Sequence, residues 1–560
     1  MKSSIIKSFS VLLVATSLLS QPIFAESGCK KNSCCKSFVT ITEDDINKAS
    51  CDSRKGLVLK KSGNYKLCEN VNWKAKKINS AAITIEADDV TLDLGGHTIK
   101  QVNTLANNSG IIVQENREFV TIHNGALQQM SLSGIYAHGG VSCLTIDSIT
   151  VHESSYNGSV PTPFPVLGTL PVAAAIFVGD DPDNFAHDIT ITNCSFCDNG
   201  ILNGTFGALV NVGAVWTNFT NDITIQNILV TNQYGNNFSV GVHCVSGSGL
   251  LLSELNASNI TGNREALGLA LTLFNDSIVE NIAVRNVTLI NDENAPQVNN
   301  AAGAEGAKYS QADHFVLRRA TFENLSVVST VPVNHTVNSM TCNGMQLSSF
   351  FGASTNGLVQ DVSVIGVHSD GALNPANNVR AAGFSNDGAD NVTYENCFVS
   401  DVSITIGHAF GFGSKKVSNN PLRNPRLIFK NCTAQNIEIL GTGVYAAGFL
   451  LSADQEQVID CTVDRIIDDR QNPKAYGVIL DTFTTGSANN CLVSGNKVTN
   501  CSTYGFYDNS GLTTNVFTSN FAAFNATNYQ GLTGQSAALI QLWNAAPPVA
   551  GPVLANISVQ

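Results

Sequence analysis

Short segments in which hydrophobic and polar residues alternate recur along this chain. Val90–Leu94, Ile189–Thr192 and Ile223–Gln226 are three of them. A period of two is typical of a strand with one buried face, whereas an amphipathic helix needs apolar residues at intervals of three and four positions. The pattern therefore predicts β-strands and argues against helical repeats.

An Asn or Asp follows most of these segments, and the segments return every 23 to 46 residues. Both residue types tolerate the left-handed backbone conformation that a bend between strands requires. Stacked Asn side chains also form hydrogen bonds along a pile of strands. We therefore expect a solenoid with one polar column at one bend of every coil. The predicted column consists of Asn124, Asp147, Asn193, Asn227, Asn256, Asn286, Asn324, Asp361, Asn396, Asn431, Asp460, Asn490 and Asn520.

A glycine begins a second recurring motif, in which it stands directly before a short apolar segment. The motif begins at Gly134, Gly241, Gly268, Gly344, Gly383, Gly448, Gly477 and Gly505. We expect each glycine to form a tight corner in front of a strand, because glycine adopts positive φ without steric cost. Together the two motifs predict an all-β solenoid of about 14 coils.

The opening coil also carries a family resemblance. Residues 62–67 (Ser-Gly-Asn-Tyr-Lys-Leu) and residues 83–99, which contain Val-Thr-Leu-Asp-Leu-Gly-Gly-His-Thr-Ile, resemble the first coils of bacterial proteins of the pectin-lyase-like superfamily. The resemblance in pattern covers residues 57–529 and implies a right-handed parallel β-helix. It implies no single activity, because the superfamily includes lyases, hydrolases, epimerases, tailspikes, adhesins and inert scaffolds.

The N-terminus has the features of a secretory signal peptide. Lys2 and Lys7 precede the apolar stretch Val11–Leu19, and Ile23–Ala25 is suited to cleavage. No later segment contains the roughly 18 uninterrupted apolar residues of a membrane-spanning helix. We therefore expect an exported protein, secreted or held at the cell envelope, with no transmembrane helix. Its predicted parts are a signal peptide (1–25), a Cys-rich basic N-terminal cap (26–56), the parallel β-helix (57–529) and a C-terminal cap (530–560).

Charge is unevenly distributed along the chain, whose formal net charge is −13. Residues 26–80 contain twelve Lys and Arg against six Asp and Glu, whereas residues 81–560 contain 17 against 38. An acidic rod repels nucleic acid, so we do not expect nucleic acid as a partner. The basic segment has two interpretations: it covers the first coil, or it anchors the rod to an anionic envelope or polysaccharide.

Fifteen cysteines are an odd number for an exported protein, so at least one thiol is free or joined to another molecule. Intermolecular disulfides through the N-terminal cysteines are therefore one predicted means of attachment. These cysteines are Cys29, Cys34, Cys35, Cys51 and Cys68. Four further cysteines next to the polar column are expected to stack in the core: Cys397, Cys432, Cys461 and Cys491.

The longest intervals between coils mark insertions, and each insertion precedes a glycine motif. They are residues 152–172, 291–313, 331–343 and 368–380. Because all four occur at the same place in the coil, we expect them to project from one edge of the rod, where they can wall a groove for an extended polymer.

The strongest candidate site is the acidic turn that directly follows the first insertion. Asp180, Asp181 and Asp183 offer oxygen ligands for calcium. Crowded carboxylates also raise the pKa of one member, which suits general-acid catalysis, and His187 lies nearby in the sequence. The alternative is a solvated acidic turn between two strands.

The catalytic motifs of the superfamily are incomplete in this chain. Polygalacturonase-like members combine Asn-Thr-Asp, Asp-Asp, Gly-His-Gly and Arg-Ile-Lys. Only Asp180-Asp181 resembles one of these elements, because Gly407-His408-Ala409 and Arg465-Ile466-Ile467 depart from the pattern. Pectate-lyase-like members use an Arg as base, which makes Arg318 a candidate. The alternative for Arg318 is an ion pair with an acid such as Glu323.

Most aromatic residues of the coils, including Trp216, Tyr476 and Tyr507, are expected to stack in the core, and only Trp73 and Trp543 are expected at a cap or surface. We therefore predict a β-helix scaffold that binds an extracellular glycan or a surface protein, and we favour a non-catalytic role because no catalytic motif is complete. The alternative is a polysaccharide-lyase-like enzyme that acts on an anionic polysaccharide. A purely structural envelope component is the third interpretation.

Overall fold

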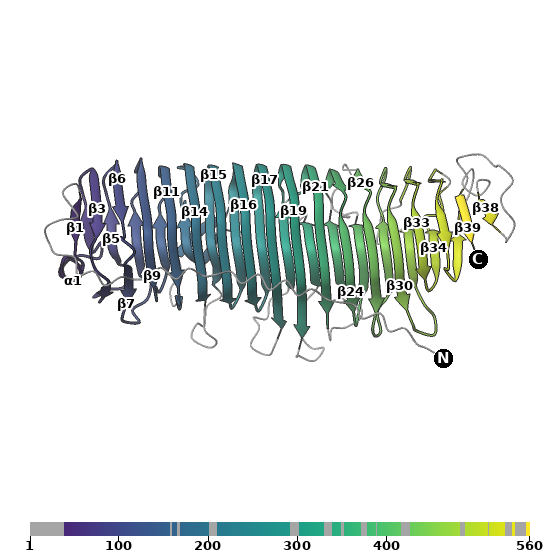
Figure 1. The fold of residues 1–560 in the computed structure, drawn as a ribbon, viewed down its shortest axis with the longest axis horizontal. Coiled ribbons are helices and arrows are strands. Elements are labelled where there is room, and N and C mark those ends of the chain that lie inside the picture. The colour runs from purple at the N-terminus through teal and green to yellow at the C-terminus, as the bar shows by residue number, and fades with distance from the viewer. Residues whose placement is uncertain are drawn as a thin grey trace, which may run out of the picture.

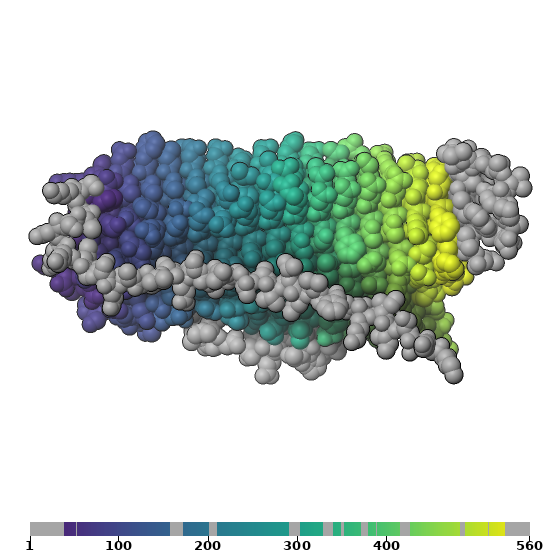
Figure 2. Space-filling view, in the orientation of Figure 1, coloured from purple at the N-terminus to yellow at the C-terminus, as the bar shows by residue number. Residues whose placement is uncertain are grey.

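The computed structural model describes residues 38–156, 160–164, 168–200, 210–291, 302–329, 339–348, 352–370, 378–387, 389–415, 426–481, 488–512, 514–532, 540–543 and 556–559. The chain forms a long rod in which successive coils lie side by side along the axis (Figure 1). The bands of colour in Figure 2 show that the coils follow one another in sequence order. The prediction of an all-β, right-handed parallel β-helix is confirmed. The number of coils stays a prediction.

Each full coil passes through three faces, which we call sheets 1, 2 and 3, and pairs in parallel with the coils before and after it. The strands that lie only in sheet 1 are β2 (Leu57–Leu59), β5 (Ala81–Ile85), β8 (Ser109–Val113), β10 (Ser133–Ala137), β13 (Gly168–Val178), β18 (Ala302–Ser310), β20 (Ser339–Ser348), β22 (Asn378–Asp387), β25 (His408–Lys415), β28 (Tyr445–Leu451), β31 (Ala475–Leu480), β34 (Tyr504–Asp508) and β37 (Thr527–Gln530). Six of the eight predicted glycine motifs lie in these strands, and those of Gly241 and Gly268 lie in the sheet 1 parts of two longer strands.

Sheets 2 and 3 complete the coil. Sheet 2 contains β1 (Val39–Ile41), β3 (Gly63–Leu67), β6 (Val90–Asp93), β23 (Asp390–Glu395), β26 (Leu427–Lys430), β29 (Gln457–Ile459), β32 (Leu492–Ser494) and β35 (Val516–Thr518). Sheet 3 contains β4 (Val71–Trp73), β7 (Thr98–Gln101), β24 (Phe398–Ile404), β27 (Thr433–Ile439), β30 (Thr462–Asp468), β33 (Lys497–Cys501), β36 (Phe521–Ala523), β38 (Ile540–Trp543) and β39 (Asn556–Val559).

Several strands continue through a bend from one sheet into the next. Sheets 2 and 3 share β9 (Val120–Gln128), β11 (Ser142–His152), β14 (Ala186–Gly200), β19 (Asp313–Ser329) and β21 (Thr355–Ser369). All three sheets share β15 (Asn211–Gly235), β16 (Phe238–Gly262) and β17 (Glu265–Asn291). One further strand, β12 (Val160–Phe164), pairs antiparallel with β13 inside the first predicted insertion.

Residues with positive φ mark the bends, and they recur at intervals of five. In one coil they are Asp222, Asn227 and Asn232, with φ of 53°, 53° and 54°. Asn and Asp suit these positions because their short polar side chains tolerate the left-handed conformation. The structure therefore has several equivalent bends per coil, where the sequence pattern predicted one.

Ladders of stacked amides exist, and parts of the predicted column stack as expected: Asn193 donates to Asp147, Asn227 to Asn193 and Asn396 to Asp361, over 2.7, 2.8 and 3.1 Å. A longer ladder lies at the next bend of the coil. Asn232 donates to Asp198, Asn259 to Asn232, Asn286 to Asn259 and Asn324 to Asn286, over 2.9, 2.9, 3.0 and 3.2 Å. Asn193 and Asn227, in contrast, belong to the bend five residues earlier, and Asn256 lies at no bend. The prediction of one continuous column was wrong because several bends of each coil carry Asn or Asp, so a recurring Asn does not identify one particular bend.

The recurring glycines lie inside the sheet 1 strands and not at corners in front of them. Gly268, Gly306 and Gly344 lack positive φ. A Cβ on Gly306 would lie 2.4 Å from Cδ1 of Phe322 and 2.5 Å from the carbonyl oxygen of Gly344 in the next coil. Glycine is needed there because coils approach closely, so the predicted reason, backbone freedom at a corner, was wrong.

The predicted insertions connect sheet 3 to sheet 1 but are shorter than expected. Strands β18, β20 and β22 occupy part of three of them. The remaining residues 292–301, 330–338 and 371–377 lie outside the described part of the chain.

The first coil is covered by helix α1 (Glu43–Asp52), at the end of the rod shown on the left of Figure 1. Thr42 and Asp45 form a capping box at the start of α1, in which each side chain accepts a hydrogen bond from the backbone of the other. Trp73 is fully buried and donates from Nε1 to Oγ of Ser50 over 2.9 Å. These contacts place α1 against the first coil, and the predicted division of the chain into caps and a β-helix stays a prediction. No helix of the described residues is long and apolar enough to cross a membrane.

The predicted stack of four cysteines contains three. Cys397 and Cys432 lie side by side on adjacent strands, and the backbone N–H of Cys432 donates to Sγ of Cys461 over 3.4 Å. Cys491 instead lies one bend earlier in its coil, next to Glu456. Burial raises the pKa of the Cys491 thiol. These thiols pack as small core residues, as predicted.

Candidate functional site

Asp180 of the acidic turn fastens that turn to the neighbouring coil. Its carboxylate accepts hydrogen bonds from the hydroxyl of Tyr136 at 2.7 Å and from the backbone of Gly139 at 2.8 Å, and Nδ1 of His138 lies 2.8 Å away. Burial would raise the pKa of Asp180, but His138, Tyr136 and Gly139 together hold it below its ordinary value. Its carboxylate is therefore ionised and occupied by internal contacts.

The other candidates of this turn are not gathered around a common point. Asp181 accepts from the backbone of Asp183 over 3.0 Å, and His187 lies 2.8 Å from the exposed carboxylate of Asp188. Within the described residues, no group of three or more His, Cys, Asp or Glu side chains could hold a metal ion. Calcium binding by Asp180, Asp181 and Asp183 stays a prediction.

Arg318 pairs with a different acid from the one predicted. Its Nε donates to Glu280 in the preceding coil over 2.7 Å, and the adjacent Arg319, which lies at a bend, donates to the same carboxylate. Glu323 accepts instead from Arg285 over 2.7 Å. Residues at equal positions of neighbouring coils are closer in space than residues five apart along one coil, which explains the change of partner.

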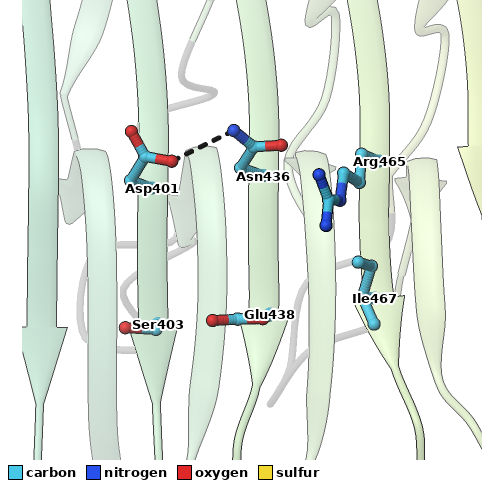
Figure 3. Close-up of a pocket in the computed structure, with 6 residues that line it drawn as sticks. All are labelled: Asp401, Ser403, Asn436, Glu438, Arg465 and Ile467. Atoms are coloured by element: carbon cyan, nitrogen blue, oxygen red, sulfur yellow. Dashed lines mark hydrogen bonds between the residues drawn. The ribbon is translucent and has the colours of Figure 1, made fainter. Parts of the chain in front are cut away.

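A shallow pocket of about 220 Å³ lies on the outer face of sheet 3 (Figure 3). Its lining residues are Asp401, Ser403, Asn436, Glu438, Arg465 and Ile467. Asn436 donates to Asp401 over 3.0 Å, so this pair serves to join two coils. Arg465 contributes a cation at the bend of β30. In the sequence, this residue stood out only as part of an incomplete motif.

A larger group of charged side chains lies on the outer face of sheet 1, although its members are far apart in the sequence. We call it the sheet 1 charged cluster. It consists of Glu265, Glu305, Lys308, Thr341, Asn343, Gln346, Arg380 and Asp387. Strand register places Glu305 beside Asn343, Lys308 beside Gln346, and Thr341 beside Arg380.

Two ion pairs span this cluster. Nζ of Lys308 lies 3.1 Å from Glu265, and Arg380 donates to Asp387 through two guanidinium nitrogens, one of them at 2.7 Å. Gln346 also donates to Asp387, over 3.0 Å. Burial would lower the pKa of Lys308, but the neighbouring carboxylates raise it. Both cations therefore stay charged beside a carboxylate partner.

Within the described part of the chain, no cation forms an ion pair with Glu305. Its residue is 1% exposed, and Oε1 accepts hydrogen bonds from Thr341 at 3.1 Å and Asn343 at 3.3 Å. Burial raises the pKa of the Glu305 carboxyl, and the charge of Lys308 opposes the rise only in part. The side chain thus tends to hold a proton, which is the property that a general acid or a hydrogen-bond donor to a ligand requires.

Aromatic rings continue the same face of sheet 1 toward the C-terminus. We call Phe410, Tyr445, Tyr476, Tyr504 and Tyr507 the aromatic row. The rings of Tyr476 and Tyr507 stack at 5.4 Å between centroids, and those of Tyr504 and Tyr507 at 5.0 Å. These residues, and Trp216 on the other side of the cluster, form small groups separate from the main core. The predicted stacking in the core is confirmed for other rings, such as Phe412 and Phe449, whose centroids lie 4.8 Å apart, but not for these residues.

The sequence contained a signal for the cluster that the pattern analysis did not use. In β18 the residues around Gly306 read Glu305-Gly-Ala-Lys308, and both charged residues point outward while Ala304 and Ala307 join the core. Outward positions therefore fall one residue before and two after each recurring glycine. A search of those positions for charges would have found Glu305 and Lys308.

The similarity of this chain to known proteins is distant. No protein-family model matches the chain, and no curated protein matches it by sequence. Among solved structures, the periplasmic alginate epimerase AlgG is 10% identical, covers 79% of this chain and 83% of its own, and has a TM-score of 0.33. The catalytic domain of a GH87 α-1,3-glucanase is 12% identical over 82% of this chain and 68% of its own, with a TM-score of 0.33.

The A-module of the Azotobacter vinelandii mannuronan C-5 epimerase AlgE6 is also similar, at 13% identity over 92% of both chains and a TM-score of 0.28. Identities this low carry no function from one protein to another. The chain is thus a parallel β-helix with a shielded charged cluster on one sheet. What the cluster does must be argued from its own residues.

Proposed function

We propose that this protein binds an extended glycan along the outer face of sheet 1. The observation that carries the proposal is that the charged cluster and the aromatic row form one continuous face. Asn343 of the cluster lies beside Ala382, which lies beside Phe410 of the aromatic row. One strand further on, Ala447 lies beside Tyr476 of the same row. Adjacent strands are about 4.8 Å apart. This face therefore suits a polymer whose sugar units repeat at a length close to the spacing between strands.

The chemistry of the two surfaces matches that of sugars. Aromatic rings pack against the apolar faces of pyranose rings, and amides and carboxyl groups exchange hydrogen bonds with hydroxyls. The cluster offers Asn343, Gln346 and Thr341 for such bonds. A surface protein is the other partner that the sequence predicts, and it would not require this alternation of rings and polar groups.

Binding is tested by calorimetry with a panel of purified oligosaccharides. We expect at least one oligosaccharide to bind, and Tyr476→Ala to weaken that binding by about tenfold or more. Tyr234→Ala is the matched control, because Tyr234 is 46% exposed and lies on another face. Equal affinities for both variants, or no binding across the panel, would contradict the proposal. Thermal melts of both variants establish that they are folded.

A carbohydrate-active enzyme is the second candidate function, and Glu305 is the observation that favours it. A buried carboxyl with a raised pKa suits protonation of a glycosidic oxygen. The polysaccharide-lyase-like form of this idea requires a cation for a uronate carboxylate, whereas Lys308 and Arg380 each already hold a carboxylate. Reducing-end assays on the polysaccharides that bind, with Glu305→Gln as the comparison, separate binding from turnover.

We further propose that the protein is exported and attached through its N-terminal cysteines. Cys51 of α1 is exposed, and no disulfide joins two of the described cysteines. Cys29, Cys34 and Cys35 lie outside the described residues. Non-reducing gels of the native protein provide the test. A higher band that reductant removes supports attachment, and a monomer under both conditions refutes it.

A further inference from the structure

Among the residues that the structure describes, three buried polar atoms of the sheet 1 charged cluster have no hydrogen-bond partner. They are Oε2 of Glu305, Oδ1 of Asn343 and Nε of Arg380. The three residues are 1%, 0% and 6% exposed. A buried polar group without a partner costs about 1 to 3 kcal/mol, so such a group needs an explanation. Three of them in one cluster indicate a ligand that both donates and accepts hydrogen bonds.

The hydrogen bonds that these side chains already make decide whether each free atom can act as a donor or as an acceptor. The amide nitrogen of Asn343 donates to Oε1 of Glu305, which leaves its oxygen as an acceptor. The terminal nitrogens of Arg380 donate to Asp387, which leaves Nε as a donor. A sugar hydroxyl satisfies both kinds of atom, and it suits Glu305 whether that carboxyl is ionised or protonated.

A carboxylate fits the same atoms poorly. It has no donor for Oδ1 of Asn343, and an ionised Glu305 would repel it. Lys308 and Arg380 are each paired with an acid, so the two pairs leave no uncompensated positive charge. The strongly acidic composition of residues 81–560 adds a long-range barrier to polyanions.

We propose that the sheet 1 charged cluster recognises an uncharged, hydroxyl-rich stretch of glycan and discriminates against uronic acids. This inference rests on the proposed function of sheet 1 and names its substrate class. Two buried ion pairs hold the cluster in shape, and the free atoms of Glu305, Asn343 and Arg380 supply the recognition.

The test uses pairs of oligosaccharides that differ only at C6. Cellohexaose is compared with its C6-oxidised form, and carboxyl-reduced hexagalacturonate with hexagalacturonate, by calorimetry at constant ionic strength. In each pair that binds, we expect the neutral member to bind about tenfold tighter or more. Equal or tighter binding of the uronate overturns the inference.

Two variants sharpen the result. Asn343→Leu removes the free acceptor and should weaken binding of the neutral member by about tenfold, whereas Asn64→Leu, an exposed control in β3, should not. Glu265→Gln removes the partner of Lys308 and should raise the affinity for the uronate member. If Glu265→Gln leaves uronate binding unchanged, the claim that paired cations exclude uronates is refuted.

Failure of this inference and failure of the proposed function give different results. If Tyr476→Ala loses binding and the wild type prefers the uronate, glycan binding on sheet 1 is upheld. The same result refutes selection for neutral sugars. No binding of any member overturns both.

Discussion

Glu456 gives the fold a pH dependence that can be worked out from its surroundings. Its side chain lies in the core with 0% exposure, next to Cys491 in the following coil. Oε2 accepts hydrogen bonds from Oγ of Ser414 at 2.9 Å and the backbone of Ala453 at 3.0 Å, while Oε1 has no partner among the described residues. Burial raises the pKa of Glu456 to about 8, from an ordinary value of 4.5, and the hydrogen bonds oppose the rise only in part.

The direction of the effect follows from where the proton is held. Between pH 4.5 and about 8 the unfolded chain ionises Glu456 while the folded protein keeps it protonated, so stability falls as pH rises through this window. The slope is about 1.4 kcal/mol per pH unit, and the total loss is roughly 5 kcal/mol. Below the window the contribution is complete, and above it the loss levels off.

The perturbation is Glu456→Gln, which keeps the shape and the accepting oxygen but cannot ionise. Urea unfolding is measured for wild type and variant from pH 4 to 9, and the difference between their free energies of unfolding isolates Glu456 from every other titrating group. We expect the variant to gain on the wild type steadily from about pH 4.5 to pH 8. A difference that is constant across this range would refute the buried, protonated state of Glu456.

Three further predictions follow from the coils and the acidic turn. Asn259→Leu should destabilise the fold by about 1 to 3 kcal/mol, because it breaks two ladder hydrogen bonds at a residue with positive φ. The control Asn256→Leu should change the stability little, and equal melting temperatures for the two variants would refute the ladder. Gly306→Ala should cost about 3 kcal/mol or more, because its Cβ would lie 2.4 Å from Phe322, and a wild-type melting temperature would contradict the close coil contact. Calcium calorimetry tests the predicted metal site: a dissociation constant of ~10⁻⁴ to 10⁻³ M that is lost in Asp181→Ala supports it, and equal heats for both proteins exclude it.

The fold class could be predicted because its cause is local. Alternation with a period of two requires only neighbouring residues, and it identified segments such as Ile189–Thr192 as strands. The capping box of Thr42 and Asp45, at the start of α1, is an equally local feature of the sequence.

The assignment of residues to one column was correct only in parts, such as Asn193 and Asn227, because it depends on contacts between coils. Asn286 and Asn324 share a bend with Asn259, but Asn227 occupies an equivalent bend five residues earlier in its coil. Every bend of the coil favours Asn or Asp for the same backbone reason. Sequence spacing cannot separate bends that share one chemistry.

The charged cluster was missed for a related reason. Glu265, Lys308 and Arg380 come from three different coils, and each is an ordinary charged residue in its own segment. Only the register of sheet 1 brings them together. The acidic turn attracted attention instead because its carboxylates are adjacent in sequence, although Asp180 serves to hold the turn in place.

The most direct test of glycan binding on sheet 1 is a crystal structure of the protein soaked with the tightest-binding oligosaccharide of the panel. We predict density along the outer face of sheet 1, with sugar hydroxyls on Glu305 and Asn343 and a ring against Tyr476. Density elsewhere, such as in the sheet 3 pocket beside Arg465, would contradict the account.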